Sequence, residues 1–533
     1  MANVEDAPVI IAGGGLVGLS AAMFLAQRGV KSLGIERLKS PSTVPRAAFF
    51  HMRTFELFRQ AGIEDQVRAQ SEKEFTPDGA IVGAESVAGR EIAAFIPSLN
   101  EGVEALSPCR RWFVSQPGLE PILKRRAQEI GAELVLGYEV ISAEQDADGV
   151  AVLTRDVDSG EERTFRGRYL IDCEGAHSKV REQLGIQMLG RGVFSNSITI
   201  YFRADLSPYL VGRNLSIIYT TNSVLGGFFR MEKGSKRGFL VVNTVGDPLV
   251  DPVAAANVAA DISEPRLIEL VRAAAGDPEL EVEIEGVARW RCTSDVAERL
   301  SEGRIFFAGD SAHLMPPNGG FGGNTGIHDA HNLAWKMAMV LKGVAGPGLL
   351  ETYSPERQPV GKFTVDQAYA RYVTRTAAYL QAQDAPAYAD DFKIELGYLY
   401  RSGAVITEPG SPTEPQDPHH SKGRPGSRAP HLWVEHDGRR VSTLDLLGEG
   451  FTLFAGPDGD AWMAAAERAG AATGAPIAFH QPGPEVAEAY GLEASGASLI
   501  RPDGFVAWRA PTAPADPAGA LTAALTQVLM KAA

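Results

Sequence analysis

The first forty residues contain two short apolar runs separated by a stretch of helical spacing. Residues 9–12 form a continuous apolar run, which is typical of a strand covered on both faces. Glycines follow at positions 13–15, and residues 16–28 then place apolar side chains at helical intervals until Gly29 ends the pattern. Residues 30–36 have the composition of a second strand. We therefore predict a complete β-α-β unit at the start of an α/β domain.

Later strand patterns are widely spaced, so we expect the first sheet to be assembled from separated segments. These patterns lie at residues 133–142, 150–155, 163–172 and 304–308. Alternating apolar and polar positions predict an antiparallel sheet inserted into the first domain, at residues 197–204, 214–219 and 238–245. Helical spacing returns at residues 326–341 and 355–383. The inserted sheet would form a platform for a substrate.

The C-terminal part of the chain has a different composition. Proline and glycine become frequent after residue 385 and predict a linker, and strand and helix patterns then return at residues 443–447, 450–454, 460–470 and 497–508. The predicted boundaries are 1–186 with 287–385 for the first domain, 187–286 for the inserted sheet, 386–430 for the linker and 431–533 for a small C-terminal α/β domain.

Composition and charge narrow the possible partners. With 44% hydrophobic and 22% charged residues the 533-residue chain has an ordinary globular composition, and a net charge of -15 disfavours a nucleic-acid partner. Cys109, Cys173 and Cys292 form no CxxC or metal-like cluster, so we expect three buried thiols and no metal site. The N-terminus lacks a basic segment and a long apolar run. We expect a cytoplasmic monomer or homodimer that binds a small molecule and no membrane.

The glycines after the first strand predict a dinucleotide site. Gly13-x-Gly15-x-x-Gly18 lies between a strand and a helix, where the glycines permit a tight turn, close approach of a pyrophosphate and close helix packing. The helix N-terminus would then face the phosphates. Glu36 ends the second strand, where a carboxylate accepts hydrogen bonds from a ribose, and Arg37 follows it. A glycine turn without a ligand is the less favoured interpretation, and the turn alone does not separate FAD from NAD(P).

A second motif selects FAD. Residues 304–313 form a buried strand pattern that ends at Gly309-Asp310, and the following loop contains Pro316, Pro317 and four glycines before a helix begins. This order resembles the class A flavoprotein monooxygenases, the para-hydroxybenzoate hydroxylase-like aromatic hydroxylases. The resemblance covers roughly residues 5–380 and implies a Rossmann-like, glutathione-reductase-type FAD domain in which Asp310 binds the ribityl chain.

The same resemblance implies further cofactor contacts. The helix after the glycine loop would direct its N-terminus at the flavin pyrimidine edge and stabilise the anionic reduced ring. Pro45-Arg46-Ala47 would place an arginine at the phosphates, with Arg53 and Arg111 as competitors, and Gln116 would contact FAD. The predicted cofactor-binding residues are Gly13, Gly15, Gly18, Glu36, Arg37, Arg46, Gln116, Gly309, Asp310, Pro317, Gly320, Gly322, Gly323 and Asn324.

One position departs from the family pattern. The family carries Asp-Gly where this chain has Glu174-Gly175, so the carboxylate is kept but is longer by one carbon. In the family this motif contacts both FAD and NAD(P)H. The substitution leaves the nicotinamide contact open and does not affect the FAD prediction.

The C-terminal domain resembles the thioredoxin-like tail of phenol hydroxylases and aromatic polyketide hydroxylases, and it lacks a CxxC pair. A packing or oligomer-forming role is therefore favoured over disulfide exchange. Residues 400–406, 423–431 and 501–509 most resemble the polyketide enzymes and point to a polycyclic phenolic or quinone substrate. The reaction implied is reduction of FAD by NADPH or NADH, addition of O2 at flavin C4a, and transfer of hydroxyl from the hydroperoxide to the ring.

Aromatic side chains on the inserted sheet are candidates for substrate binding, although such side chains more often belong to the core. We expect Phe228 and Phe229 to bind the substrate and Tyr219 with Arg375 to act in catalysis. For four histidines, a packing role is favoured over acid-base chemistry: His51, His313, His328 and His331.

Two other functions stay open at this point. A Baeyer-Villiger or oxidative ring-modifying enzyme would use the same flavin chemistry, and a non-catalytic flavin protein would bind a ligand without turnover. A flavin halogenase is disfavoured because the chain has no Trp-x-Trp-x-Ile-Pro stretch.

Overall fold

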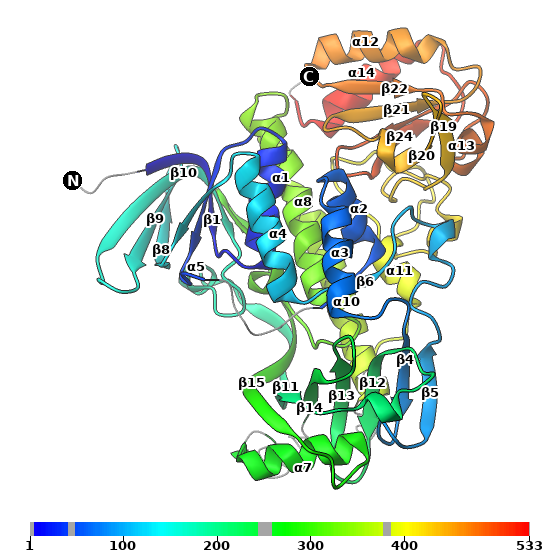
Figure 1. Ribbon diagram of the computed structural model, residues 1–533. Helices are drawn as coiled ribbons and strands as arrows, with labels where there is room; N and C mark the ends of the chain where they lie inside the picture. The colour runs from blue at the N-terminus through cyan, green and yellow to red at the C-terminus, as the bar shows by residue number, and fades with distance from the viewer. Residues whose placement is uncertain (1–4, 41–47, 244–257, 259, 377–384, 532–533) are drawn as a thin grey trace.

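The computed structural model describes residues 5–40, 48–243, 258, 260–376 and 385–531. Figure 1 shows the first sheet at the left with its helices beside it, a second sheet below them, and a C-terminal unit above them. Within the described residues, no helix is both long and apolar enough to cross a membrane.

The first sheet has a parallel centre, in which neighbouring strands follow the order β16-β17-β10-β1-β2-β7. Its strands are β1 (Glu5–Ala12), β2 (Ser32–Glu36), β7 (Glu133–Leu136), β10 (Glu162–Asp172), β16 (Ser301–Glu302) and β17 (Ile305–Phe307). Val9 to Ala12 are fully buried, as the continuous apolar run predicts for a strand covered on both faces. Because β1, β2, β10 and β17 run in parallel, their carboxyl ends meet at one edge.

The helices α1 (Leu16–Gln27), α4 (Gln116–Glu129) and α8 (Phe321–Leu341) pack beside this sheet (Figure 1). Contacts join α1 to both α4 and α8, and α1 is buried from Gly18 to Ala26. The other helices of this part are α2 (Met52–Gln60), α3 (Glu64–Glu74), α5 (Lys179–Gln183), α9 (Gly348–Glu351) and α10 (Tyr353–Arg375). The prediction for α10 extended into residues 377–383, which lie outside the described residues.

The strand predicted at residues 133–142 is divided in two. Gly137 has a φ of +84° and separates β7 from β8 (Tyr138–Gln145). β8 pairs with β9 (Val150–Asp156), and β9 pairs antiparallel with β10. A short pair of strands, β3 (Phe49–Phe50) and β6 (Trp112–Phe113), lies apart from the sheet.

The second sheet follows the order β18-β15-β11-β14-β13-β12-β4-β5. Its strands are β4 (Ala80–Ala84), β5 (Glu91–Ile96), β11 (Met188–Arg203), β12 (Leu215–Thr221), β13 (Gly226–Met231), β14 (Arg237–Asn243), β15 (Glu283–Ala297) and β18 (His313–Leu314). β4 and β5 come from the segment that the sequence assigned to the first domain, and β4 joins β12 in parallel. The predicted strand at residues 238–245 ends within the described residues at Asn243.

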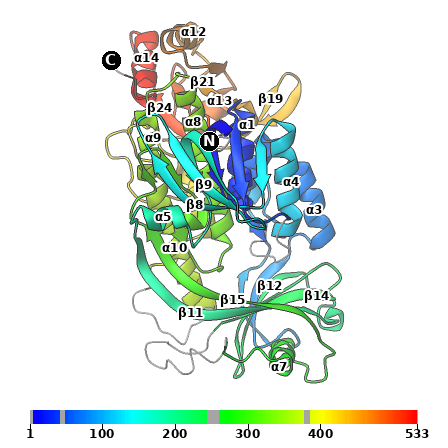
Figure 2. The ribbon, with the colours of Figure 1, turned by 90° about the vertical axis from the view of Figure 1, so that its left-hand side faces the viewer.

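Helix α7 (Glu264–Ala275) covers the face of the second sheet that points away from the first domain (Figure 2). Its Leu267, Leu270 and Val271 are buried in one cluster with Phe202 and Phe229 of the sheet. The other face, which is rich in aromatic side chains, points towards the first domain.

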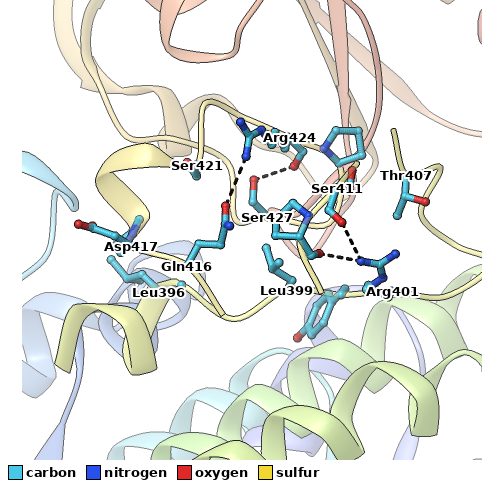
Figure 3. A pocket seen from close by; sticks show the side chains of 15 residues that line it. Leu396, Leu399, Arg401, Thr407, Ser411, Gln416, Asp417, Ser421, Arg424 and Ser427 are labelled. Atoms are coloured by element: carbon cyan, nitrogen blue, oxygen red, sulfur yellow. Dashed lines mark hydrogen bonds between the residues drawn. The ribbon is translucent and has the colours of Figure 1, made fainter. Parts of the chain in front are cut away.

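The segment predicted as a linker contains ordered structure. Helix α11 (Asp391–Leu396) precedes Tyr398 and Tyr400, which are buried beside Phe505. Figure 3 shows the polar contacts of the following turns, in which Arg401 Nη1 donates to the Pro412 carbonyl at 2.7 Å. The pocket between these turns holds only about 20 Å³, which is too small for a metabolite. The linker is therefore a packed connection.

The C-terminal unit is a four-stranded sheet in the order β22-β21-β23-β24 with helices against it. Its main elements are β21 (Phe451–Ala455), α12 (Ala461–Thr473), β22 (Ile477–His480), α13 (Pro484–Ala489), β23 (Ala497–Ile500), β24 (Val506–Ala510) and α14 (Pro517–Val528). The predicted strand at residues 497–508 is a hairpin that turns at Gly504, whose φ is +78°. Residues 443–446 form a 3-10 helix, and β19 (Trp433–His436) pairs with β20 (Arg439–Ser442).

Buried charges join the C-terminal unit to the first domain. Arg501 Nη1 donates to Glu356 Oε1 at 2.6 Å, and Lys336 Nζ donates to Glu356 Oε2 at 2.8 Å. On α2, Glu56 accepts from Arg53 at 2.9 Å and from Arg428. We call the following residues, all at most 5% exposed, the junction cluster: Arg53, Glu56, Lys336, Glu356, Arg428, Arg501 and Asp503.

Candidate functional site

A single cavity of about 1210 Å³ runs from the glycine turn after β1 to the aromatic face of the second sheet. Its first part is bordered by the ends of the parallel strands, including Gly13, Glu36 and Asp310. Its second part is bordered by sheet side chains, including Tyr219 and Trp290. The two halves of the predicted site therefore share one space.

The glycines of the first turn have different roles. Gly13 has a φ of +96°, and a Cβ there would lie 2.4 Å from the Cys173 carbonyl oxygen. A Cβ on Gly18 would lie 1.8 Å from the Gly13 carbonyl oxygen, so Gly18 is needed for packing of α1 and does not border the cavity. Gly15 borders the cavity, and its Cβ would meet nothing closer than Glu120 Oε1 at 3.9 Å. The space beside Gly15 is the space that a pyrophosphate needs.

The end of β2 holds a fixed carboxylate. Glu36 Oε2 accepts from the Gly14 N–H at 2.6 Å, and Oε1 accepts from the Leu38 N–H at 2.7 Å. These bonds orient Glu36 towards the glycine turn. Arg37 is exposed and also borders the cavity.

The motif after β17 is positioned by a buried acid on α8. Gly309 has a φ of +64°, and its N–H donates to Asp329 Oδ2 at 3.1 Å. Asp329 also lies 2.7 Å from His313 Nε2 and accepts from Arg357 Nε at 2.7 Å. Burial would raise the pKa of Asp329, but the charge of Arg357 and the contact with His313 lower it below its ordinary value. This network leaves Asp310 exposed at the cavity wall.

The glycine loop brings its backbone to the cavity. Gly320 has a φ of +70°, is the N-cap of α8, and would place a Cβ 2.9 Å from Phe49 Cβ. Gly322 and Gly323 in the first turn of α8 border the cavity, as does Pro317 before it. A Cβ on Gly322 would meet nothing closer than 3.8 Å. The first turn of α8 thus lies beside this space, and a helix leaves the N–H groups of its first turn without intrahelical partners.

Asn324 supports this loop from behind. Its Oδ1 accepts from the His51 N–H at 2.9 Å and from Thr54 Oγ1 at 2.6 Å. Its Nδ2 donates to the carbonyls of Phe49 and Gly320 at 2.9 and 2.7 Å. Because Asn324 does not border the cavity, we regard it as a residue that positions the loop.

The predicted polar contacts to the phosphates are only partly described. Gln116 borders the cavity at the start of α4, and its Nε2 donates to Glu120 Oε1 at 2.6 Å. Arg46 lies outside the described residues. Its two competitors are engaged elsewhere: Arg53 belongs to the junction cluster, and Arg111 Nε donates to Glu395 Oε1 at 2.9 Å.

Glu174 borders the cavity beside a buried aspartate. Asp172 accepts from Ser178 Oγ at 2.6 Å and from Ser311 Oγ at 2.7 Å, which ties the ends of β10 and β17 together. Glu174 Oε2 has no hydrogen-bond partner among the described residues. Burial, reinforced by the charge of Asp172, raises the pKa of Glu174 to about 8. A protonated Glu174 adds no negative charge to this wall at neutral pH.

The aromatic face carries most of the predicted substrate residues. Tyr219 on β12 and Phe228 on β13 are register partners whose ring centroids lie 5.6 Å apart, and both border the cavity. Arg375 at the end of α10 borders it as well, 5.9 Å from the Tyr219 ring, and it donates to the Tyr388 hydroxyl. Burial raises the pKa of Tyr219, so its hydroxyl stays protonated near neutral pH.

Phe229 does not share this face. Side chains alternate along β13, so Phe229 lies on the opposite face, 5.7 Å from the Phe202 ring in the cluster under α7. It does not border the large cavity, and we leave it out of the substrate site.

The four histidines are buried and none borders the cavity. Burial lowers the pKa values of His51, His328 and His331, which favours their neutral forms. His51 Nε2 lies 3.0 Å from the Gly319 carbonyl oxygen and supports the glycine loop. Cys173, expected to be buried, is instead partly exposed, at the cavity wall.

Arg230 and Trp290 were missed by the sequence analysis. Both border the cavity, and Trp290 Nε1 donates to Thr199 Oγ1 at 2.9 Å. Arg230 follows Phe228 by two positions, so the alternation of β13 would have placed both on one face. No local motif marks Trp290.

Comparisons with known proteins agree with this geometry. A family model described as FAD binding domain matches residues 6–368, and one described as Aromatic-ring hydroxylase, C-terminal, matches residues 422–532. The chain is 48% identical to a 4-methyl-5-nitrocatechol 5-monooxygenase from Burkholderia sp, with 99% of this chain and 98% of the relative covered. It is 37% identical to a tetracenomycin A2 monooxygenase-dioxygenase from Streptomyces glaucescens, over 99% and 98% of the two chains.

A solved structure of aklavinone-11 hydroxylase in ternary complex with FAD and aklavinone superposes with a TM-score of 0.92 at 36% identity, covering 99% of this chain and 100% of the other. The glycine turn, Glu36, Asp310 and the start of α8 surround a space that fits a dinucleotide, and the cavity continues to an aromatic wall. Fold and site thus define an FAD-binding flavoprotein of mixed α/β architecture. The chain belongs to the FAD-dependent aromatic-ring hydroxylases and is a flavin-dependent monooxygenase.

Proposed function

We propose that this enzyme uses NAD(P)H and O2 to insert one oxygen atom into a phenolic ring. The observation that carries the proposal is the continuity of the cavity: the space beside Gly15 and Asp310 opens directly onto the face formed by Tyr219 and Phe228. Bound FAD would supply the redox and oxygen chemistry. The protein would hold the ring near the flavin and keep water away from it.

The described residues divide into two functional groups. Gly13, Gly15, Glu36 and Gln116 would hold the adenosine diphosphate part, and Asp310 would hold the ribityl chain. The N-terminus of α8 and the preceding loop, Pro317 to Gly323, would stabilise negative charge on the reduced ring, because unpaired helix N–H groups attract an anion. We propose Tyr219 and Arg375 as groups that orient the phenol and assist its ionisation.

A single-ring nitrophenol or catechol is the first substrate class to test. The relative at 48% identity is named for a nitrocatechol and matches almost the whole chain. A polycyclic phenol or quinone is the second class, because the aklavinone-11 hydroxylase complex superposes with a TM-score of 0.92. The size of the cavity does not separate the two, since the same space must also contain FAD.

For the C-terminal unit we propose a thioredoxin-like fold with a packing role. The four-stranded sheet with helices against it supports this fold, and the absence of cysteine from residues 431–533 removes disulfide exchange. The junction cluster supports a docking role.

The test uses purified, FAD-loaded protein with a panel of nitrophenols, catechols and polycyclic phenols. We expect a yellow protein, NAD(P)H oxidation stimulated by the substrate, and a product heavier by the oxygen that was inserted. An oxygenated product with an opened or expanded ring would favour the Baeyer-Villiger or ring-modifying alternative. Ligand binding without NAD(P)H consumption would favour a non-catalytic flavin protein. Failure to bind FAD would contradict the proposal.

A further inference from the structure

Arg230 lies at the wall of the substrate part of the cavity, among aromatic rings. It is 4% exposed, and its guanidinium carbon lies 3.7 Å from the centroid of the Phe75 ring and 3.8 Å from that of Phe113. Phe113 is in turn stacked on Phe49 with centroids 4.7 Å apart. Phe49 contacts Gly320 of the glycine loop. A row of planar groups thus connects the flavin side of the cavity with Arg230.

The guanidinium is not fully paired by the protein. Its Nη2 is buried and has no hydrogen-bond partner within the part of the chain that the structure describes. Burial lowers the pKa of Arg230 below its ordinary value, although an arginine stays protonated under physiological conditions. A buried cation without a carboxylate partner is costly. The aromatic faces offset part of this cost and leave directed N–H donors unused.

Two other buried arginines are paired with carboxylates. Arg357 on α10 is fully buried and donates to Asp329 Oδ1, and Arg111 is paired with Glu395. The charges of Glu74 and Glu232 favour the protonated form of Arg230, but they act on it only from a distance. Neither forms an ion pair with Arg230 within 4.0 Å among the described residues.

Arg230 lies between two spaces that could admit an anion. A neighbouring pocket of about 320 Å³ also borders Arg230. Glu232 lines it and disfavours an anion there, and the second arginine that lines it, Arg213, is paired with Glu91. On the side of the large cavity the adjacent walls are formed by uncharged rings, such as Phe113, Phe228 and Phe239. These rings are suited to cover an aromatic substrate whose charged substituent reaches the guanidinium.

We propose that Arg230 is a specificity-determining residue that binds an anionic oxygen substituent of the aromatic substrate, so that the enzyme selects the ionised form of an acidic phenol. This inference rests on the proposed function, because it assigns the substrate to the aromatic part of the cavity. A guanidinium offers a planar fork of donors that matches a phenolate oxygen. The anion completes the hydrogen bonding that the protein leaves open.

The experiment measures ligand binding to FAD-loaded protein by calorimetry. The probes are 4-nitrophenol, at a pH where it is ionised, and 4-nitroanisole, which has the same ring but cannot ionise. The variants are Arg230→Gln, Arg230→Lys and the control Arg237→Gln. Arg237 lies on the adjacent strand β14, is 52% exposed and pairs with Glu285, so its substitution removes the same charge from the surface. Flavin absorbance verifies that each variant is folded and loaded.

We expect Arg230→Gln to weaken 4-nitrophenolate binding about 10- to 100-fold, as for loss of a hydrogen bond to a charged group, and nitroanisole binding by less than about threefold. Arg230→Lys should restore part of the affinity, and Arg237→Gln should resemble the unchanged protein. The affinity of the wild-type protein for 4-nitrophenol should rise with pH as the phenol ionises. The affinity of the Arg230→Gln variant should not rise.

Equal weakening of both ligands would show that Arg230 only builds the wall, and it would overturn the proposal. The proposal would also be overturned if the wild-type protein bound 4-nitrophenolate no more tightly than 4-nitroanisole. Turnover is measured in parallel, so that the role of Arg230 and the proposed oxygenation are tested separately. Selective loss of phenolate binding without any oxygenated product in the unchanged protein would support the role of Arg230 and contradict the proposed function.

Discussion

The junction cluster and Arg230 both place charge in the interior, but only the junction cluster pairs it. Around Glu356, Arg501 and Lys336 donate to the two carboxylate oxygens, and Asp503 accepts from Arg501. Around Arg230 there are two aromatic rings and an Nη2 without a partner among the described residues. The first arrangement is complete without a ligand. The second is complete only when an anion arrives.

This contrast separates groups that hold the fold from groups that serve the site. Removing one member of a paired buried cluster leaves its partner uncompensated and destabilises the protein. Removing an unpaired charge relieves a desolvation cost and should affect the ligand more than the fold.

Glu356→Gln should be the most damaging change at the junction. It leaves Arg501 and Lys336 without their shared carboxylate, and breaking a buried pair costs about 3–5 kcal/mol of unfolding free energy. Urea unfolding of the FAD-loaded protein measures the loss. A loss of unfolding free energy smaller than that of the surface variant Glu285→Gln would show that the junction cluster does not hold the C-terminal unit in place.

Acid should weaken the junction through Glu56. Burial opposes its ionisation, but Arg428 and Arg53 prevail and lower the pKa of Glu56 from 4.5 to about 2. Above pH 4.5 Glu56 is ionised in both the folded and the unfolded state, so its stabilising effect is complete. As pH falls from 4.5 towards 2, the unfolded state takes up the proton first, and the free energy of unfolding decreases. The loss, complete once the pH has fallen to about 2, is about 3 kcal/mol.

Unfolding curves at several pH values between 6 and 3, roughly spanning the ordinary carboxyl range, test this effect. The Glu56→Gln variant should have a lower stability at neutral pH and a flatter acid dependence. Parallel curves for the two proteins would contradict the assignment to Glu56.

Through Glu174, FAD binding should depend on pH in the neutral to alkaline range. Burial, together with Asp172, raises its pKa from 4.5 to about 8, so the folded state keeps this proton between those values while the unfolded state has lost it. The contribution of Glu174 to stability therefore falls as pH rises from 4.5 to 8. Ionisation also adds a negative charge near the pyrophosphate space, and we expect FAD affinity to fall about fivefold between roughly pH 7 and 9.

Fluorescence titration of the apoprotein with FAD gives the affinity at each pH. Glu174→Gln should remove the decrease, because the amide does not ionise. An equal decrease in both proteins would assign the effect to another group.

Arg230→Met should change stability by less than about 1 kcal/mol, or increase it, because an apolar chain of similar length replaces an unpaired buried charge. The same variant should raise KM for an ionised phenol more than it lowers kcat. Urea unfolding and steady-state kinetics on one preparation check both statements. A destabilisation as large as that of Glu356→Gln would erase the distinction between the two regions.

The smallest effect is expected at an exposed pair. Glu285→Gln removes the partner of Arg203 and Arg237 on the second sheet, and surface pairs contribute about 0–1 kcal/mol. Urea unfolding in low and high salt measures the difference in unfolding free energy between the wild type and Glu285→Gln. Salt should reduce even this small difference because it screens surface charges. A larger loss would show that the edge of the sheet depends on its charges.

The glycine turns of the proposed cofactor site could be predicted from sequence because they act through local backbone geometry. Gly13, Gly18 and Gly309 are required by turns and close approaches that each motif encodes within a few positions. Asp329 was missed because its role depends on α8 packing against the Gly309 turn, a contact between distant parts of the chain.

The substrate half depends on which face of a strand each residue occupies. Phe228 and Phe229 are neighbours on β13, so only one of them can face the cavity, and sequence composition does not say which. Once Phe228 is placed there, Arg230 follows from the alternation. The packed segment at residues 386–430 was hidden by its proline and glycine content, although Tyr398 and Tyr400 are buried in it.

Isotope incorporation tests the proposed oxygenation most directly. FAD-loaded enzyme, NADPH and a nitrocatechol or related phenol are incubated under ¹⁸O2, and the product is analysed by mass spectrometry. We expect one labelled oxygen atom in the product, and its incorporation should depend on NAD(P)H and on the phenol. A product whose new oxygen derives from water, or NADPH oxidation that yields only hydrogen peroxide with every phenol tested, would contradict it.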